Sequence, residues 1–313
     1  MKRRNVLKLG ASSVCALGLG GLTSFTPPQA RAATVNVSLV CEARDVTLPD
    51  NSGTVTQWRF VDPLNGGPGQ LDAGLALSDT DELVVELTNR LPVSVNFAIS
   101  GVLSGTPACP PGQTRTYRLP APAAGSYFFF DEQNGEAGRA MGLFGPMAVT
   151  SSTGIPEIYP GGPSFDRAYT LTWHELDTRL NAVLASGQNV DLDQYEPDYF
   201  FVNGLSYPAT GTDASTDLLM QLGEQVALRL INCGLIYNSV HFHGFHVNVI
   251  ARDRIPQTDI VTKDTVLVAP GETVDVMVPV TQRGLYPVHN HFLPAVTANG
   301  VYPNGALLII RAL

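Results

Sequence analysis

Helical patterning is almost missing from this sequence of 313 residues. The segment LDTRLNAVLASG, residues 176–187, is the one modest candidate for an amphipathic helix. Elsewhere glycine and proline recur about every 8 to 12 residues and separate short segments rich in Val, Leu, Thr, Tyr and Phe. This spacing argues against a helical bundle and predicts an all-β protein built from β-sandwiches.

Beyond its first segment the sequence lacks an apolar run long enough to span a bilayer, so we expect no stable membrane anchor. Residues 1–25, MKRRNVLKLGASSVCALGLGGLTSF, combine a basic start with a mildly apolar stretch, and PPQARA offers a cleavage site that ends at Ala32. Arg3 and Arg4 followed by NVLK are similar to the twin-arginine export motif; an ordinary secretory signal is the alternative. We expect residues 1–32 to be a twin-arginine-type export signal and the protein to be periplasmic or secreted.

Basic residues are scarce once that segment is set aside. Residues 1–32 hold five basic and no acidic side chains, which leaves 14 basic against 28 acidic and a net charge of −14. Such a surface repels nucleic acid and anionic membranes. We therefore expect no nucleic-acid partner.

Cysteine is scarce too, with Cys41, Cys109 and Cys233 left after cleavage. In an oxidising compartment two of them could pair, and Cys41 with Cys109 is the favoured couple because both fall in the first half of the chain. Cys233, in RLINCG at a predicted strand end, is interpreted as a small core residue.

A weak internal repeat divides the mature chain. Residues 81–101 are echoed by 223–244, and residues 110–132 by 269–291. We predict two similar sandwiches at residues 33–152 and 166–313, joined by a linker rich in glycine and proline at 153–165. In this repeat, Asn96 and Ala98 correspond to His241 and His243, and Phe130 and Glu132 to His289 and His291.

Five of the six histidines lie in two short segments, SVHFHGFH (239–246) and YPVHNH (286–291). Alternation along a strand points His241 and His243 to one side, and likewise His289 and His291. Four imidazoles facing one volume predict a site for copper or zinc, their commonest metals. His246 follows a glycine and is expected just outside the ligands, whereas the isolated His174 is interpreted as a core residue.

The segments GEQVALRLIN, VHFHGFHVNVI, PGETVDVMVPV and YPVHNH resemble the C-terminal cupredoxin domain of multicopper oxidases, and DELVVELTNRLP with GSYFFFDEQNGEAGRAMGLFGPMAV resembles their first domain. The resemblance covers nearly all of the mature chain. It implies two tandem cupredoxin-like Greek-key β-sandwich domains.

The same resemblance shows which copper ligands are missing. The family's type 1 copper uses a histidine, a cysteine and a second histidine, with a methionine further on; here those three positions hold Asn238, Asn290 and Ala295, and no methionine follows. Without a thiolate a blue copper site cannot form. The chain is therefore not expected to act as an ordinary laccase.

The family's trinuclear cluster needs four histidines from each of two domains, and only the second domain's four remain. The resemblance implies that one ion, most simply one copper per chain with zinc as the alternative, meets His243, His289 and Glu132. His241 and His291 would stand beside it, and Asp131 next to Glu132. The alternative for Glu132 is a solvated loop acid.

Two functions follow from these patterns. The first is an exported protein that binds one copper ion in its C-terminal half, for copper handling or for a copper-dependent oxidoreductase reaction on a small molecule or oxygen. The second is a metal-free structural or interaction protein, like the copper-free cell-division relative within the family. Two-domain relatives form trimers with clusters between chains, so the resemblance also allows a homotrimer in which Glu132 comes from a neighbouring subunit.

Overall fold

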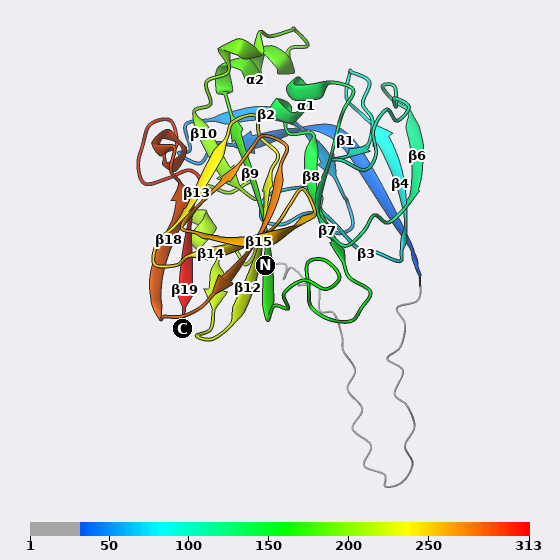
Figure 1. Ribbon diagram of the computed structural model, residues 1–313. Helices are drawn as coiled ribbons and strands as arrows, with labels where there is room; N and C mark the ends of the chain where they lie inside the picture. The colour runs from blue at the N-terminus through cyan, green and yellow to red at the C-terminus, as the bar shows by residue number, and fades with distance from the viewer. Residues whose placement is uncertain (1–31) are drawn as a thin grey trace.

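The computed structural model describes residues 32–313, and most of its ordered elements are strands (Figure 1). In the first half of the chain a first sheet has the order β2-β1-β4-β6 and a second sheet the order β3-β8-β7-β5. A short helix, α1 (Gly135–Met141), connects β7 to β8. The strands are β1 (Thr34–Thr47), β2 (Thr54–Val61), β3 (Leu75–Ser78), β4 (Glu82–Asn89), β5 (Ala98–Ile99), β6 (Thr114–Pro120), β7 (Gly125–Phe130) and β8 (Phe144–Thr150).

The second half repeats this plan with larger sheets. A third sheet has the order β10-β9-β12-β17-β14-β15 and a fourth sheet the order β11-β19-β18-β13-β16. The strands are β9 (Arg167–Leu176), β10 (Tyr199–Val202), β11 (Leu218–Met220), β12 (Gln225–Asn232), β13 (Asn238–Phe242), β14 (Val247–Arg252), β15 (Ile255–Lys263), β16 (Thr265–Val268), β17 (Thr273–Pro279), β18 (Gly284–Asn290) and β19 (Leu307–Ala312). The helical turns are α2 (Thr178–Ala185), η1 (Leu192–Gln194), η2 (Ala209–Gly211) and η3 (Leu293–Val296).

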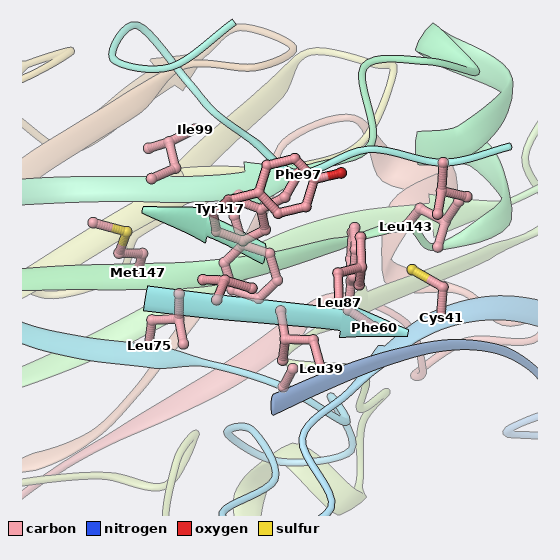
Figure 2. Close-up of a cluster of buried hydrophobic side chains, with 14 of the residues drawn as sticks. Leu39, Cys41, Phe60, Leu75, Leu87, Phe97, Ile99, Tyr117, Leu143 and Met147 are labelled. Atoms are coloured by element: carbon pink, nitrogen blue, oxygen red, sulfur yellow. The ribbon is translucent and has the colours of Figure 1, made fainter. Parts of the chain in front are cut away.

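Each pair of sheets encloses an apolar core. On β4, Leu83, Val85 and Leu87 alternate inward and are fully buried. Figure 2 shows this first core, where the rings of Phe60 and Phe97 lie 5.4 and 5.5 Å from the ring of Phe129. Burying one such side chain contributes about 1.5–3 kcal/mol. A second core, between the third and fourth sheets, is formed in the same way by β-branched and leucine side chains.

The internal repeat is visible in matching hydrogen bonds. Asn89 at the end of β4 donates to the carbonyls of two loop residues and accepts from the backbone amide two positions on. Asn232 at the end of β12 makes the same three bonds at 2.8, 3.0 and 3.0 Å. Each asparagine thereby satisfies the backbone of the loop that leads into the next strand.

The third sheet lies between the first half and the fourth sheet. Strand β7 packs against β12 and β17, and a small apolar cluster joins Phe128 and Phe144 to Ile231 and Cys233. Ser126 donates to the buried carboxylate of Asp275, and Arg229 donates to the Ser126 hydroxyl at 2.9 Å. The fourth sheet is consequently turned away from the first half, at the left of Figure 1.

The structure confirms the all-β prediction. The single helix expected from the sequence is also confirmed: α2 begins after Asp177, whose carboxylate accepts from the amides of Arg179 and Leu180. The predicted export signal falls on residues 1–32, of which 1–31 lie outside the described part of the chain. Cys41, Cys109 and Cys233 are all buried and free, so the favoured Cys41–Cys109 pairing is not formed in this structure. Within residues 32–313, no helix is long and apolar enough to cross a membrane.

Candidate metal centre

Four histidines share the outer surface of the fourth sheet. Val240 and Phe242 of β13 point inward to the second core, so the alternating His241 and His243 point outward. On the neighbouring strand, His289 lies directly opposite His241 in an antiparallel pair. We call the surface formed by His241, His243, His289 and His291 the histidine face.

The four rings lie within contact distance of one another. The ring centre of His241 is 4.7 Å from that of His243, 5.7 Å from that of His289 and 5.1 Å from that of His291. The His243 and His289 centres are 5.2 Å apart, and those of His289 and His291 are 5.9 Å apart. The predicted convergence of the two H-x-H pairs is therefore present in the geometry.

His243 and His289 approach most closely, with their Nε2 atoms 3.0 Å apart. The Nδ1 atom of His289 lies 3.0 Å from the backbone carbonyl of Asn290. Because a carbonyl only accepts, this Nδ1 carries the proton, and in neutral His289 the Nε2 lone pair accepts from Nε2–H of His243. A backbone contact that fixes the tautomer of an imidazole in this way is characteristic of histidine ligands.

The surroundings of the rings keep the lone pairs accessible. His241 Nδ1 lies 2.9 Å from the hydroxyl of Thr265 on β16, a contact that the sequence analysis missed because β16 carries no local signal for it. His243 and His291 are exposed, and His241 and His289 are half-buried. Partial burial, together with the three neighbouring imidazoles, lowers the pKa of His243 and so favours its neutral form.

Gly244 lies two residues after the end of β13 and lets the chain turn beside the site. Its φ of +73° is readily adopted only by glycine. A Cβ atom at this position would lie 2.2 Å from the ring of Tyr286. Glycine therefore allows His243 to leave the strand while Tyr286 stays packed beneath the turn.

The type 1 positions hold a hydrogen-bonded amide pair. Asn290 donates to Asn238 at 2.6 Å and accepts from the backbone amides of Ser239 and Phe292 at 3.1 and 3.0 Å. Both asparagines and Ala295 are buried. These residues contain neither a thiolate nor an imidazole, so they do not fit a type 1 copper.

The strand pairing corrects the alignment of the repeat by two residues. Ala98 pairs with Phe130, just as His241 pairs with His289. The amide of Asn96 donates to Asp131, as the amide of Ser239 does to Asn290. Ala98 and Ser100, rather than Asn96 and Ala98, therefore occupy the positions that correspond to His241 and His243.

Glu132 and Asp131 are held within the first half. Glu132 accepts from the backbone amide of Gly105 at 2.7 Å, and no hydrogen bond or ion pair in residues 32–313 joins it to a histidine. Asp131 is fully buried and accepts from the amides of Asn96, Gln133 and Asn134. Its carboxylate thus organises a turn of the first half.

The remaining two histidines lie outside the histidine face. His246 is exposed beyond Gly244. His174 is buried and stacks on Phe201 at 5.0 Å, which confirms its interpretation as a core residue. Burial, with a smaller effect of the nearby Arg59 charge, lowers the pKa of His174 to about 3.

The histidine face fits a metal ion only in part. In the described residues, no three His, Cys, Asp or Glu side chains are arranged to hold one. Imidazole nitrogens bound about 2.0–2.1 Å from one ion lie about 2.9 Å apart at a right angle and about 3.3 Å apart in a tetrahedron. The Nε2 separation of 3.0 Å between His243 and His289 is that of a hydrogen bond, and it also suits two adjacent ligands of a tetragonal ion.

Comparisons with known proteins agree with this architecture. Two family models, both described as multicopper oxidase, match residues 71–154 and 184–302. Laccase-7 of Oryza sativa subsp. japonica is 27% identical over 277 residues, which cover 82% of this chain and 46% of that protein. Laccase-14 of the same organism is 26% identical over 259 residues. The chain spans less than half the length of these curated relatives.

Solved structures share the fold over most of the chain. The blue copper oxidase from Nitrosomonas europaea superposes with a TM-score of 0.74 and 22% identity, covering 90% of this chain and 86% of that one. The copper nitrite reductase from the same organism superposes with a TM-score of 0.69 and 18% identity, covering 90% and 94%. The paired cupredoxin-like sandwiches and both family matches lead to one conclusion: the chain belongs to the multicopper oxidase superfamily, whose cofactor is copper.

Proposed function

We propose that this chain is an exported copper-binding protein that holds one copper ion on its histidine face. The observation that carries the proposal is the His243–His289 pair, with its Nε2 atoms 3.0 Å apart and the His289 tautomer set by the Asn290 carbonyl. His241 and His291 lie beside the pair, with the His241 ring centre 4.7 Å from that of His243 and the His291 ring centre 5.9 Å from that of His289, and would serve as further ligands. The Nε2 separation of 3.0 Å is closer to the spacing of about 2.9 Å between adjacent ligands of a tetragonal ion than to the spacing of about 3.3 Å in a tetrahedron, which supports copper(II) over zinc.

A bound copper ion would supply redox chemistry or simply be carried. The residues at the type 1 positions offer no thiolate route for electrons, so ordinary laccase turnover is not proposed. The chain's own contribution is to hold neutral imidazoles on a rigid sheet, where partial burial and the neighbouring imidazoles lower the pKa of His243.

The test is the metal content of protein exported by its own twin-arginine-type signal and purified without chelator. We expect one copper per chain, a type 2 spin-resonance signal and no intense blue absorbance. His243→Ala and His289→Ala should each weaken copper binding by more than about tenfold, because each removes one of the two closest ligands. The matched control His246→Ala, which changes an exposed histidine outside the site, should bind as the wild type does.

Two results would contradict the proposal. One is a wild-type chain that takes up no copper; the other is copper affinity unchanged in His243→Ala and His289→Ala. Either result favours a metal-free interaction protein on the same fold. If the protein binds zinc more tightly than copper, the assignment of copper is wrong, but the proposed metal site is not.

We also propose that further copies of the chain, as a homotrimer, cover the histidine face. Leu285 and Leu267, on the same outer surface of the fourth sheet, are 70% and 49% exposed, and a neighbouring subunit on this surface would cover them. A neighbouring subunit's Glu132 could then supply the missing acidic ligand. Light scattering should give the mass of three chains for the wild type and of one chain for Leu285→Glu, and a monomeric wild type would contradict this assembly.

A further inference from the structure

A cavity of about 660 Å³ lies between the two halves, apart from the histidine face. Residues of β1 and β2 and the loop around Gln70 form one wall, and the segment from Phe201 to Thr212 forms the other. The walls are tied together by a backbone hydrogen bond of 2.8 Å from Gln70 to Asn203. Its volume is in the range of about 300–1,000 Å³ that is typical of small-molecule sites.

Arg59 is the buried cation of this cavity. Its side chain lines the wall, yet the residue is only 5% exposed. None of the ion pairs formed within residues 32–313 includes Arg59, although a buried guanidinium normally has a carboxylate partner. Burial lowers the pKa of Arg59, and the nearby charge of Asp72 offsets this in part.

The hydrogen bonds of Arg59 leave one edge of the guanidinium underused. Nε and Nη2 both donate to the same acceptor, the side-chain oxygen of Gln57, the former at 2.9 Å. Nη1 has only a long contact of 3.5 Å to the carbonyl of Gln70. The fork formed by Nη1 and Nη2 therefore retains donors with the geometry that binds a carboxylate through both oxygens.

The rest of the lining indicates what such a carboxylate would be attached to. Arg44, Asp45 and Asp72 also line the cavity, so its charged lining carries both signs, as a zwitterion requires. No hydrogen bond or ion pair within the described residues reaches the Asp72 carboxylate. Phe201 and Leu205 add an apolar surface beside these charges.

We propose that this cavity binds a small zwitterion with an apolar side chain, an amino acid or dipeptide, whose carboxylate is held by Arg59 and whose ammonium group faces Asp72. The ligand would pair the one buried cation of the cavity, place an ammonium beside the free carboxylate and cover Phe201 and Leu205. Because both halves line the cavity, binding would also hold the two sandwiches together.

The test is calorimetric titration of the purified full chain with L-leucine, leucylleucine, isocaproate, isoamylamine and inorganic phosphate. Isocaproate lacks the ammonium group of leucine and isoamylamine lacks its carboxylate, so both should bind at least about tenfold more weakly than leucine or leucylleucine. Failure of both zwitterions to bind below about 10 mM overturns the proposal. Binding of isocaproate or phosphate as tightly as leucine overturns it as well.

Variants identify the residues involved. Arg59→Lys keeps the charge but loses the fork, and should weaken leucine binding by about tenfold or more. The matched control Arg90→Lys changes an exposed arginine outside the cavity and should bind leucine normally. Asp72→Asn, which removes the carboxylate that would face the ammonium group, should weaken leucine but not isocaproate. Normal leucine binding by folded Arg59→Lys, or by Asp72→Asn, would refute the assignment.

Discussion

Glu175 at the end of β9 makes the stability of the protein dependent on pH. The residue is 4% exposed, and one oxygen of its carboxylate accepts from the amides of Leu235 and Ile236 and from the hydroxyl of Tyr195. Burial raises the pKa of Glu175 from 4.5 to about 7 in spite of these bonds. Between pH 4.5 and pH 7, therefore, Glu175 is protonated in the folded state and ionised in the unfolded state.

The sign and size of the effect follow from proton linkage. Because the pKa is higher in the folded state, the contribution of Glu175 is fully present below pH 4.5 and is lost as the pH rises to about 7. The rise of the Glu175 pKa from 4.5 to about 7 corresponds, at 1.36 kcal/mol per pKa unit, to a change of about 3 kcal/mol in the free energy of unfolding. Glu175→Gln keeps the accepting oxygen but has no proton to lose, so its stability should not show this decrease.

The assay is urea unfolding at a series of pH values, followed by tryptophan fluorescence. The free energy of unfolding of the wild type minus that of Glu175→Gln should fall by about 3 kcal/mol between pH 4.5 and pH 7. The exposed Glu136→Gln serves as the control for loss of a carboxylate from the surface. A difference between wild type and Glu175→Gln that stays constant across this range would refute the reasoning.

Four further substitutions test the site and the contact between the halves. Gly244→Ala should lower copper affinity in the metal titration and cost at least about 1 kcal/mol, because the new methyl group meets the Tyr286 ring at a positive φ. Ser126→Ala should lower the free energy of unfolding by about 2 kcal/mol, since it removes the hydroxyl donor from the buried Asp275 carboxylate, and an unchanged urea midpoint would contradict this. Asn290→Ala should cost about 2–3 kcal/mol in the same assay because it removes three hydrogen bonds of a buried side chain, and Asn290→Asp, which keeps the acceptors, should cost less at low pH.

The sequence predicts the fold because its local and long-range signals agree. Short strands, turn residues at regular spacing and the repeat of residues 81–101 in 223–244 all indicate tandem β-sandwiches. The alternation of His241 with Phe242 predicts which side chains face the core, and the structure has this arrangement. The convergence of the histidines from β13 and β18 was predictable for the same reason.

The exact register of the repeat was not predictable from alternation. Ser94–Val95 resembles Ser239–Val240, and this local match aligns Asn96 of the first copy with His241 of the second. The strand pairing instead shows that Ala98 is the residue equivalent to His241. A shift of two residues keeps every side chain on the same face of a sheet, so the pattern of polar and apolar residues cannot distinguish the two alignments.

The Arg59 cavity was missed for a different reason. Arg59 stands between Trp58 and Phe60 in an apolar strand, and a lone charge in such a strand is the only local signal for it. The opposite wall of its cavity, from Phe201 to Thr212, comes from a distant part of the chain. Contacts between residues so far apart depend on how the two sandwiches pack, which periodicity within one strand does not encode.

The amide pair of Asn238 and Asn290 bears on the order in which folding and metal loading occur. This pair connects β13 to β18 by a side-chain hydrogen bond that does not depend on a metal ion. The imidazoles of His241 and His289 therefore lie on directly paired residues in the metal-free chain as well. Loading then requires ring rotation and loss of water rather than ordering of backbone, and little conformational entropy is lost at that step. We therefore expect the metal-free protein to give the same far-ultraviolet circular dichroism spectrum as the copper-loaded protein, with uptake complete within the time of mixing.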